Sequence, residues 1–244
     1  MSLAGRRVVV TRPAAQAQPL VDRLREFGAE PVVVPLIEIV APTDGGAALG
    51  DALSRLAEFD WIVVTSANGA GRVAAALAHS STRPRIAAVG AATAAALGVP
   101  VDLVPAVQTA EALAAELGSG SGTLLLVQPE AGTNQGRRSL LRRALTAAGW
   151  TVSAVDAYRT VPVMPSSGER SRVLSADAAL FASGSAVRSW VTAFGTETPA
   201  VTAAIGPSTA QVAAEIGLKI DIVAADHSLH GLAECLLVYF ADAS

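Results

Sequence analysis

Two side chains stand out as candidates for chemistry, a tyrosine and an arginine. Tyr158 is one of only two tyrosines in the 244-residue chain, and it lies in an extended segment, where its phenol could give a proton to a leaving oxygen. Arg12 directly follows the first β-branched run, where its guanidinium could hold a carboxylate or a phosphate. Structural alternatives stay open, because strand tyrosines often serve packing alone and Arg12 could be a solvated loop residue.

Four turns rich in small hydroxyl residues each stand between a strand-like run and a helical pattern. They contain Thr65 and Ser66, Thr93, Ser183 and Ser185, and Ser208 and Thr209. Free backbone N–H groups at a helix start, together with hydroxyl donors, suit anionic oxygens. The same residue types are preferred as simple helix N-caps, so each turn alone also has that structural interpretation. Four such turns facing one cleft would favour a ligand with several acid groups.

Other kinds of site find no support in the sequence. The three histidines, His79, His227 and His230, have no partner at metal-ligand spacing, and the single Cys235 excludes an intramolecular disulfide and a cysteine-based metal site. No segment has the pattern of a P-loop, a dinucleotide-binding glycine motif or a nucleophile elbow. We therefore expect no metal and no cofactor. Four arginines of one helical segment are expected to form a solvated face, from which those nearest the helix start could reach the site: Arg137, Arg138, Arg142 and Arg143.

Composition indicates a globular protein. Hydrophobic residues make up 51% and charged residues 16%, which excludes disorder, and 18 Lys+Arg against 21 Asp+Glu give a net charge of −3 without a basic block. We therefore expect no nucleic-acid partner and no membrane partner. The apolar runs fall well short of the roughly 20 residues that a membrane span needs. The first residues lack the apolar core of a signal peptide, so a cytoplasmic location is expected.

Short β-branched runs alternate with longer alanine- and leucine-rich segments, which is typical of βαβ units around parallel sheets. The spacing of Leu20, Leu24 and Phe27 predicts a helix over 14–28, with Gly28 as its stop. Strands are predicted at 8–11, 32–34, 60–64, 86–89, 124–127, 178–181 and 203–205.

The chain also contains an internal duplication in permuted order. Five pairs of segments resemble one another at offsets between 116 and 121 positions. They are 63–70 with 180–187, 87–94 with 203–210, 109–117 with 228–236, 8–13 with 124–129, and 32–37 with 153–158. A nearly constant offset over so many blocks indicates that two similar structural units are present.

The order of the blocks predicts that one unit is inserted into the other. Residues 1–35 and 163–244 would form a discontinuous α/β domain, and 40–156 a second α/β domain. The chain would cross between them through extended linker strands at 36–39 and 157–162. We therefore predict two similar doubly wound parallel-sheet lobes of flavodoxin-like type, joined by a two-stranded linker. In such sheets ligands bind beyond the carboxyl ends of the strands, so the hydroxyl-rich turns should face a cleft between the lobes.

Motifs along nearly the whole chain carry a resemblance to a known family. They lie at 10–13, 35–39, 59–69, 88–93, 110–113, 155–160 and 204–210. Together they are similar to the uroporphyrinogen-III synthase family, whose fold has two α/β lobes and a two-stranded linker. The chain departs from the family at 128–130, where many members have an Arg- or Gly-containing turn, and at 228–230, where a Pro- and Thr-rich stretch is common.

The resemblance implies that the chain cyclises hydroxymethylbilane, a linear tetrapyrrole octacarboxylate, to uroporphyrinogen III. The reaction loses water and inverts ring D through a spiro intermediate, and it belongs to the biosynthesis of tetrapyrroles such as heme and corrinoids. By resemblance, Tyr158 would assist departure of the ring A hydroxyl. The carboxylates would be oriented by Arg12, Thr65, Ser66, Thr93, Ser183, Ser185, Ser208 and Thr209. A further implied partner is hydroxymethylbilane synthase, in a transient contact that hands over the labile substrate.

A second interpretation, from another class, stays open at this point. The chain could instead be a non-catalytic, two-lobed regulatory module that binds an anion or a tetrapyrrole. Such a module would have the same hinge and the same turns. The full set of family motifs favours the enzyme, whereas an appended DNA-binding segment would favour the regulator.

Overall fold

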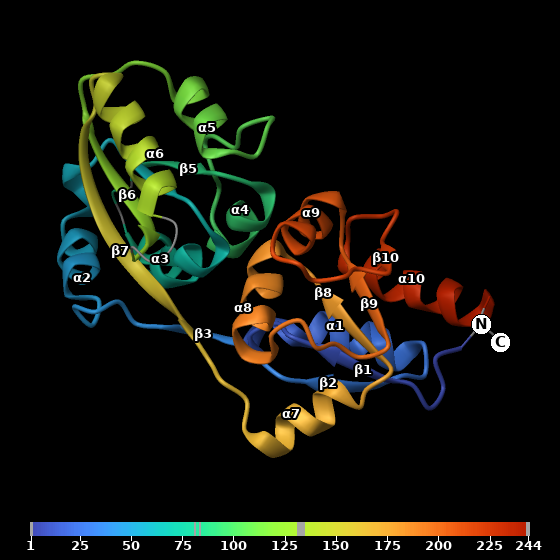
Figure 1. Ribbon diagram of the computed structural model, residues 1–244. Coiled ribbons are helices and arrows are strands. Elements are labelled where there is room, and N and C mark those ends of the chain that lie inside the picture. Colours follow the sequence, from blue (N-terminus) through green and yellow to red (C-terminus); the bar gives the residue numbers. More distant parts are fainter. Residues whose placement is uncertain (1, 81, 83, 131–134, 243–244) are drawn as a thin grey trace. The chain divides into compact units, whose positions relative to one another are not determined.

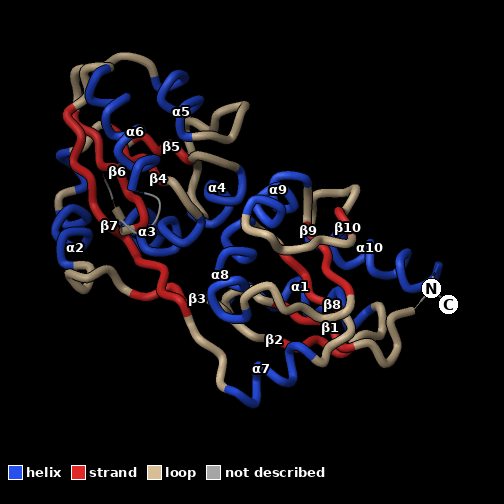
Figure 2. Tube along the Cα trace, viewed as in Figure 1, coloured by secondary structure: helices blue, strands red, loops and turns tan. Residues whose placement is uncertain are grey.

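The computed structural model describes residues 2–80, 82, 84–130 and 135–242. The chain forms two compact units. The discontinuous unit consists of Met1–Glu38 and Val161–Ser244, and the inserted unit consists of Ile39–Thr160. In each unit a sheet of mainly parallel strands is covered by helices on both faces (Figure 1), and strands and helices largely alternate along the chain (Figure 2). The predicted α/β class with doubly wound parallel sheets is confirmed.

The sheet of the discontinuous unit has the order β10-β9-β8-β1-β2, with every neighbouring pair parallel. Counted along the unit, this is the 2-1-3-4-5 order of flavodoxin-like folds. Its strands are β1 (Arg7–Val10), β2 (Glu30–Val33), β8 (Ala178–Phe181), β9 (Val201–Ala204) and β10 (Ile222–Val223). Helices α1 (Ala14–Glu26) and α10 (Leu229–Asp242) cover one face, and α7 (Ser167–Leu174), α8 (Gly184–Phe194) and α9 (Pro207–Glu215) cover the other.

The inserted unit has the sheet order β3-β7-β6-β4-β5. Its strands are β3 (Ile37–Val40), β4 (Trp61–Val64), β5 (Arg85–Ala88), β6 (Thr123–Pro129) and β7 (Thr151–Pro162). One face is covered by α2 (Ala47–Ser54), the 3-10 helix η1 (Leu56–Glu58), α3 (Ala67–His79) and α4 (Ala91–Leu97), and the other by α5 (Ala110–Leu117) and α6 (Gln135–Ala147). A parallel bridge between Ala87 and Leu103 takes the place that β10 has in the other unit. Apart from β3, the two sheets therefore follow the same plan.

The duplication extends to the hydrogen bonds at the strand starts. The Asp60 carboxylate accepts the backbone N–H of Thr123 at 2.7 Å, and Asp177 accepts that of Arg7 at 2.8 Å. Both aspartates precede a central strand and bind the first residues of its neighbour. The arrangement recurs one strand further on, where Asp102 and Asp221 accept from Ile86 and Thr202 at 2.7 and 2.9 Å.

Burial explains why the β-branched runs form central strands. Every residue of β4, β8 and β9 is buried, so these strands lie between two layers of helices and need no polar alternation. Each fully buried aliphatic side chain contributes about 1.5–3 kcal/mol by leaving water.

Among the described residues, no helix has both the length and the apolar character that crossing a membrane would require.

The chain passes between the units twice, at the junctions that lie in β3 and near the end of β7. These two strands are neighbours in the sheet of the inserted unit. Just beyond them, the N–H of Val163 donates to the carbonyl of Leu36 at 2.9 Å. The segments 36–39 and 157–162, interpreted as linkers from the sequence, thus largely belong to regular strands.

Candidate functional site

Ser66 and Tyr158 meet in the inserted unit. Ser66 follows β4 and is the N-cap of α3, where its Oγ accepts the N–H of Gly69 at 3.1 Å. The Tyr158 hydroxyl, carried by β7, donates to the same Oγ at 3.0 Å. The Tyr158 ring packs in the core between the sheet and α2–α4, and the residue is only 6% exposed. The structure therefore brings together two residues that are 92 positions apart in the sequence.

The two bonds determine what Ser66 can still do. A serine hydroxyl has one proton to donate and two lone pairs to accept with. Both lone pairs are engaged, by Gly69 and by Tyr158. Its remaining capacity is to donate, and Ser66 is only half-buried. Ser66 is thus poised to donate to an acceptor such as a carboxylate or a leaving hydroxyl, and Tyr158 polarises it from behind.

The neighbouring Thr65 is engaged within its own sheet. Its hydroxyl donates to the carbonyl of Val127 at 3.2 Å, and its backbone N–H reaches the same oxygen at 3.2 Å. The Thr65 side chain thereby ties the end of β4 to β6.

The corresponding turn of the discontinuous unit keeps the cap but has no tyrosine. Ser183 is the N-cap of α8 and accepts the N–H of Ala186 at 3.2 Å. Its Oγ lies 2.9 Å from the Oγ of Ser185, which is exposed. By the offset of the repeat, the position equivalent to Tyr158 is Ile37. The Ser66–Tyr158 pair is therefore a difference between two otherwise similar units.

The turns at α4 and α9 have glycine N-caps, Gly90 and Gly206, without a side-chain cap bond from the glycine itself. Thr93 and Thr209 stand in the first turns and are 6% and 3% exposed, whereas Ser208 is exposed. Both threonines are therefore buried, and of these three hydroxyl residues Ser208 is the exposed one.

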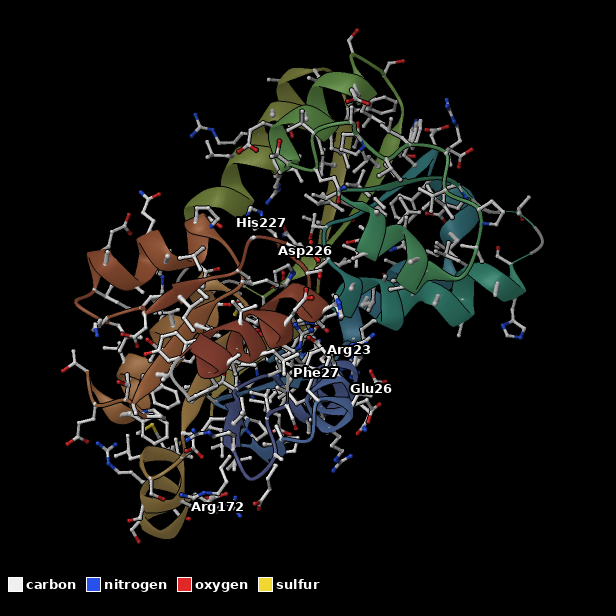
Figure 3. The ribbon with its side chains drawn as sticks, turned by 90° about the vertical axis from the view of Figure 1, so that its right-hand side faces the viewer. Arg23, Glu26, Phe27, Arg172, Asp226 and His227 are labelled. Atoms are coloured by element: carbon white, nitrogen blue, oxygen red, sulfur yellow. The ribbon has the colours of Figure 1, made fainter. Side chains whose placement is uncertain are left out.

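Two residues that sequence reasoning missed cover these two helix starts. The Gln108 amide oxygen accepts the N–H of Ala91 at 3.0 Å and lies so close to Gly90 that a Cβ there would stand 2.4 Å from it. In the other unit the ring of His227 lies 3.1 Å from where a Cβ on Gly206 would stand. Figure 3 shows His227 beside Asp226 in the segment before α10. A signal existed, because Gln108 and His227 are 119 positions apart, one of the offsets of the repeat.

Arg12 follows β1 and is half-buried, with its Nε donating to the carbonyl of Gln16 at 3.0 Å. Burial lowers the pKa of its guanidinium from the usual value, which still leaves a cation at neutral pH. In α6, Arg142 and Arg143 are exposed, as expected for a solvated face. The side chains of Arg137 and Arg138 lie outside the described residues.

The remaining candidates for chemistry are few. Within the described ranges, no group of three or more His, Cys, Asp or Glu side chains is placed to hold a metal ion. Burial raises the pKa of the Cys235 thiol to about 11, so the residue is a thiol at neutral pH. His79 bonds the carbonyl of Ala75 at its own helix end, at 2.7 Å. His230 lies 3.8 Å from Glu234 and contacts the ring of Phe27, which Figure 3 shows at the end of α1 with Arg23 and Glu26.

Comparison with known proteins decides the family. Residues 18–234 match the family described as uroporphyrinogen-III synthase HemD. The chain belongs to the uroporphyrinogen-III synthase family. A curated uroporphyrinogen-III synthase of Synechococcus elongatus is 32% identical over 166 residues, which are 65% of this chain and 62% of that protein. A porphyrin biosynthesis protein HemD of Ruminiclostridium josui is 43% identical over 67 residues, 28% of this chain and 13% of that protein. The matches thus span less than two thirds of these relatives' lengths.

Solved structures of the uroporphyrinogen-III synthase family have the same fold. A mutant uroporphyrinogen III synthase of Thermus thermophilus matches 98% of this chain and 100% of its own with a TM-score of 0.66 at 20% identity. The uroporphyrinogen-III synthetase of Helicobacter pylori matches 97% of this chain and 99% of its own with a TM-score of 0.59 at 16% identity. At such identities the likeness concerns the fold, and the family assignment rests on the sequence match.

Proposed function

We propose that this protein cyclises hydroxymethylbilane to uroporphyrinogen III, with loss of water and inversion of ring D. The observation that carries the proposal is the family match over residues 18–234, which includes all four hydroxyl-rich turns and the Ser66–Tyr158 pair. The curated relative that shares 32% identity is named for this activity. The two units would serve as domains that hold the bilane in one folded geometry.

The first chemical step is departure of the ring A hydroxyl. The carbon–oxygen bond breaks as the hydroxyl takes up a proton, so that water leaves and the electron-rich pyrrole stabilises the cationic carbon. We assign the donation to Ser66, whose outward O–H is its remaining hydrogen-bonding capacity, with Tyr158 behind it able to supply the proton in turn. General acid assistance of this kind contributes about 10²-fold or more. The proton lost on aromatisation of the attacking ring restores the pair.

The second task is to bind the acid side chains so that ring D can only close after inversion. Backbone N–H groups at helix starts favour carboxylates by the helix dipole, and hydroxyl donors add directed bonds. Ser183, Ser185 and Ser208 are accessible for this role, and Arg12 adds a cation. Thr65, Thr93 and Thr209 would act by shaping the turns. Holding reacting atoms in one geometry is the larger part of such catalysis.

The experiment supplies enzymatically generated hydroxymethylbilane to the purified chain and separates the porphyrins formed after oxidation. Without enzyme the bilane closes without inversion, so type I is the background. We expect type III as the main product, and an all-type I product would overturn the proposal. A regulatory module that only binds the bilane would give type I at an altered rate, so the same assay separates the two interpretations.

We also propose a cytoplasmic location and a transient contact with hydroxymethylbilane synthase, because a labile bilane favours direct transfer. If transfer is direct, the two enzymes assayed together should give less type I isomer than they give when the bilane must first be released into solution. Equal type I fractions in mixed and sequential assays would contradict the contact.

A further inference from the structure

A pocket of about 510 Å³ lies in the inserted unit, at the end of β6 and beside the first half of β7. Residues of this unit line it, from the loop after β3, from β6 and β7, and from α6. They include Thr43, Asp44, Gln128, Glu130, Arg142 and Asp156. Its size is within the range of small-molecule sites.

Gln128 is the unusual member of this lining. It is 7% exposed, and among the residues that the structure describes its side chain has no hydrogen-bond partner. Buried amides are normally satisfied, because an unmade hydrogen bond is costly away from water. The neighbouring carboxylates are satisfied: Glu130 accepts both the N–H and the hydroxyl of Thr43, and Asp44 accepts the N–H groups of Gly46 and Ala48. The unused amide at the pocket wall therefore points to a ligand.

The charge of the lining selects the class of ligand. Three carboxylates, Asp44, Glu130 and Asp156, line the pocket with one arginine, Arg142, and a second arginine, Arg159, is close enough to act on Glu130, so acidic groups are still in excess among the described residues. Hydrogen bonds from Ala48 and Gly46 lower the pKa of Asp44, and those from Thr43 lower the pKa of Glu130, so both carboxyls are ionised at neutral pH. Such a wall repels acid groups and accepts N–H donors.

The duplication provides an independent comparison. Gln128 and Arg12 each precede the proline of the matching segments, Pro129 and Pro13, at an offset of 116. Where the discontinuous unit has a half-buried cation, the inserted unit has a buried neutral amide. The equivalent positions thus differ in the chemistry they offer, one for an acid group and one for a neutral donor.

We propose that the pocket beside Gln128 holds a pyrrole ring of the linear tetrapyrrole, with the Gln128 amide oxygen accepting the pyrrole N–H. The inference rests on the proposed function for the identity of the ligand. Gln128 is then a specificity residue that fixes one ring by its nitrogen edge, while the acid side chains are held elsewhere.

The test uses small pyrroles, so it does not depend on turnover. The side-chain amide signal of Gln128 in ¹⁵N-labelled protein is assigned by its loss in Gln128→Leu and followed during titration with 2,5-dimethylpyrrole and with 1,2,5-trimethylpyrrole, which lacks the N–H. We expect a saturable shift with the first and at least about tenfold weaker binding of the second. No saturable shift, or equal binding of the two, would overturn the proposal even if the chain makes uroporphyrinogen III.

Variants give a second readout. Gln128→Leu removes the unsatisfied amide, so its Tm should stay equal or rise by about 2–4 °C. Its KM for hydroxymethylbilane should rise about tenfold with little change in kcat. The control Gln18→Leu removes an exposed amide bonded to Asp22 in α1 and should change neither constant. A lower Tm with unchanged KM in Gln128→Leu would show a structural role and refute the pocket assignment. If the wild-type chain forms only type I product, the proposed function fails while the titration still decides on the pocket.

Discussion

Replacing Tyr158 by phenylalanine isolates one hydroxyl group. The ring stays in the core between the sheet and α2–α4, so the substitution leaves no cavity, and Ser66 still caps Gly69. What is lost is the 3.0 Å bond from the Tyr158 hydroxyl to Ser66 Oγ. A neutral hydrogen bond contributes about 0.5–1.5 kcal/mol to stability. For a chain of this size that corresponds to a fall in Tm of about 2–5 °C.

The effect on catalysis should be much larger than the effect on stability. Without the phenol behind it, Ser66 loses its proton supply, and kcat for hydroxymethylbilane should fall about 10²-fold. Spontaneous closure then competes, so the fraction of type I product should rise in step with the loss of rate.

The assay is a stopped time course of type I and type III porphyrins together with thermal unfolding of the same preparation. Tyr239→Phe is the matched control, because it removes the other tyrosine hydroxyl, from a 39% exposed residue of α10, and should change neither kcat nor the isomer ratio. Full activity of Tyr158→Phe alongside a lowered Tm would refute the acid role and leave Tyr158 as a packing residue.

Other substitutions test the fold that positions the site. Ser66→Ala should destabilise more than Ser183→Ala, by about 1–3 kcal/mol in urea unfolding, because it also strands a buried tyrosine hydroxyl; equal losses would contradict the pairing. Gly231→Ala should lower the free energy of unfolding by about 1–3 kcal/mol, since the added Cβ would stand 2.2 Å from a backbone oxygen. Gly71→Ala, in open space within α3, should raise it by about 0.5–1 kcal/mol. Denaturation midpoints that rank the two variants the other way would refute this. In the capping box of α7, the hydroxyl and the N–H of Ser166 lower the pKa of Glu169. The ionised carboxylate therefore stabilises the fold above the pKa of the unfolded chain, and this stabilisation is lost as the pH falls through the lower folded pKa. Glu169→Gln should accordingly show a smaller loss of Tm between about pH 5 and pH 3 than the wild type.

The fold followed largely from local patterns. The run from Ala178 to Phe181 forms a strand with those bounds, and Ser66 and Ser183 cap helices as small hydroxyl residues commonly do. The permuted repeat was visible because its blocks keep nearly the same offset, and apart from β3 the two sheets share one strand order. Such features depend on neighbours in sequence or on a repeated pattern, which a single chain displays.

The candidate site was harder to predict because its contacts join distant residues. Nothing in the local sequence places the Tyr158 hydroxyl on Ser66, since a register shift in the pairing of β6 with β7 occurs just before Tyr158. Gln108 covers a helix start from a separate loop, and no local signal marks a glutamine as a cap. Gln128 is buried at a pocket that it shares with the loop after β3 and with α6, and these distant segments come together only in the folded unit.

The insertion of one unit into the other bears on the order of events during protein synthesis. Val10 pairs with Leu180 in the middle of a sheet, so the ribosome must deliver a strand long before its partner. Once the intervening unit has folded, its two ends leave through adjacent strands, and the open loop between these partners shrinks from about 170 residues to about 50. By loop-closure entropy this shortening favours the later pairing by about 1 kcal/mol. Nascent chains should therefore complete the inner unit first and close the outer sheet around it.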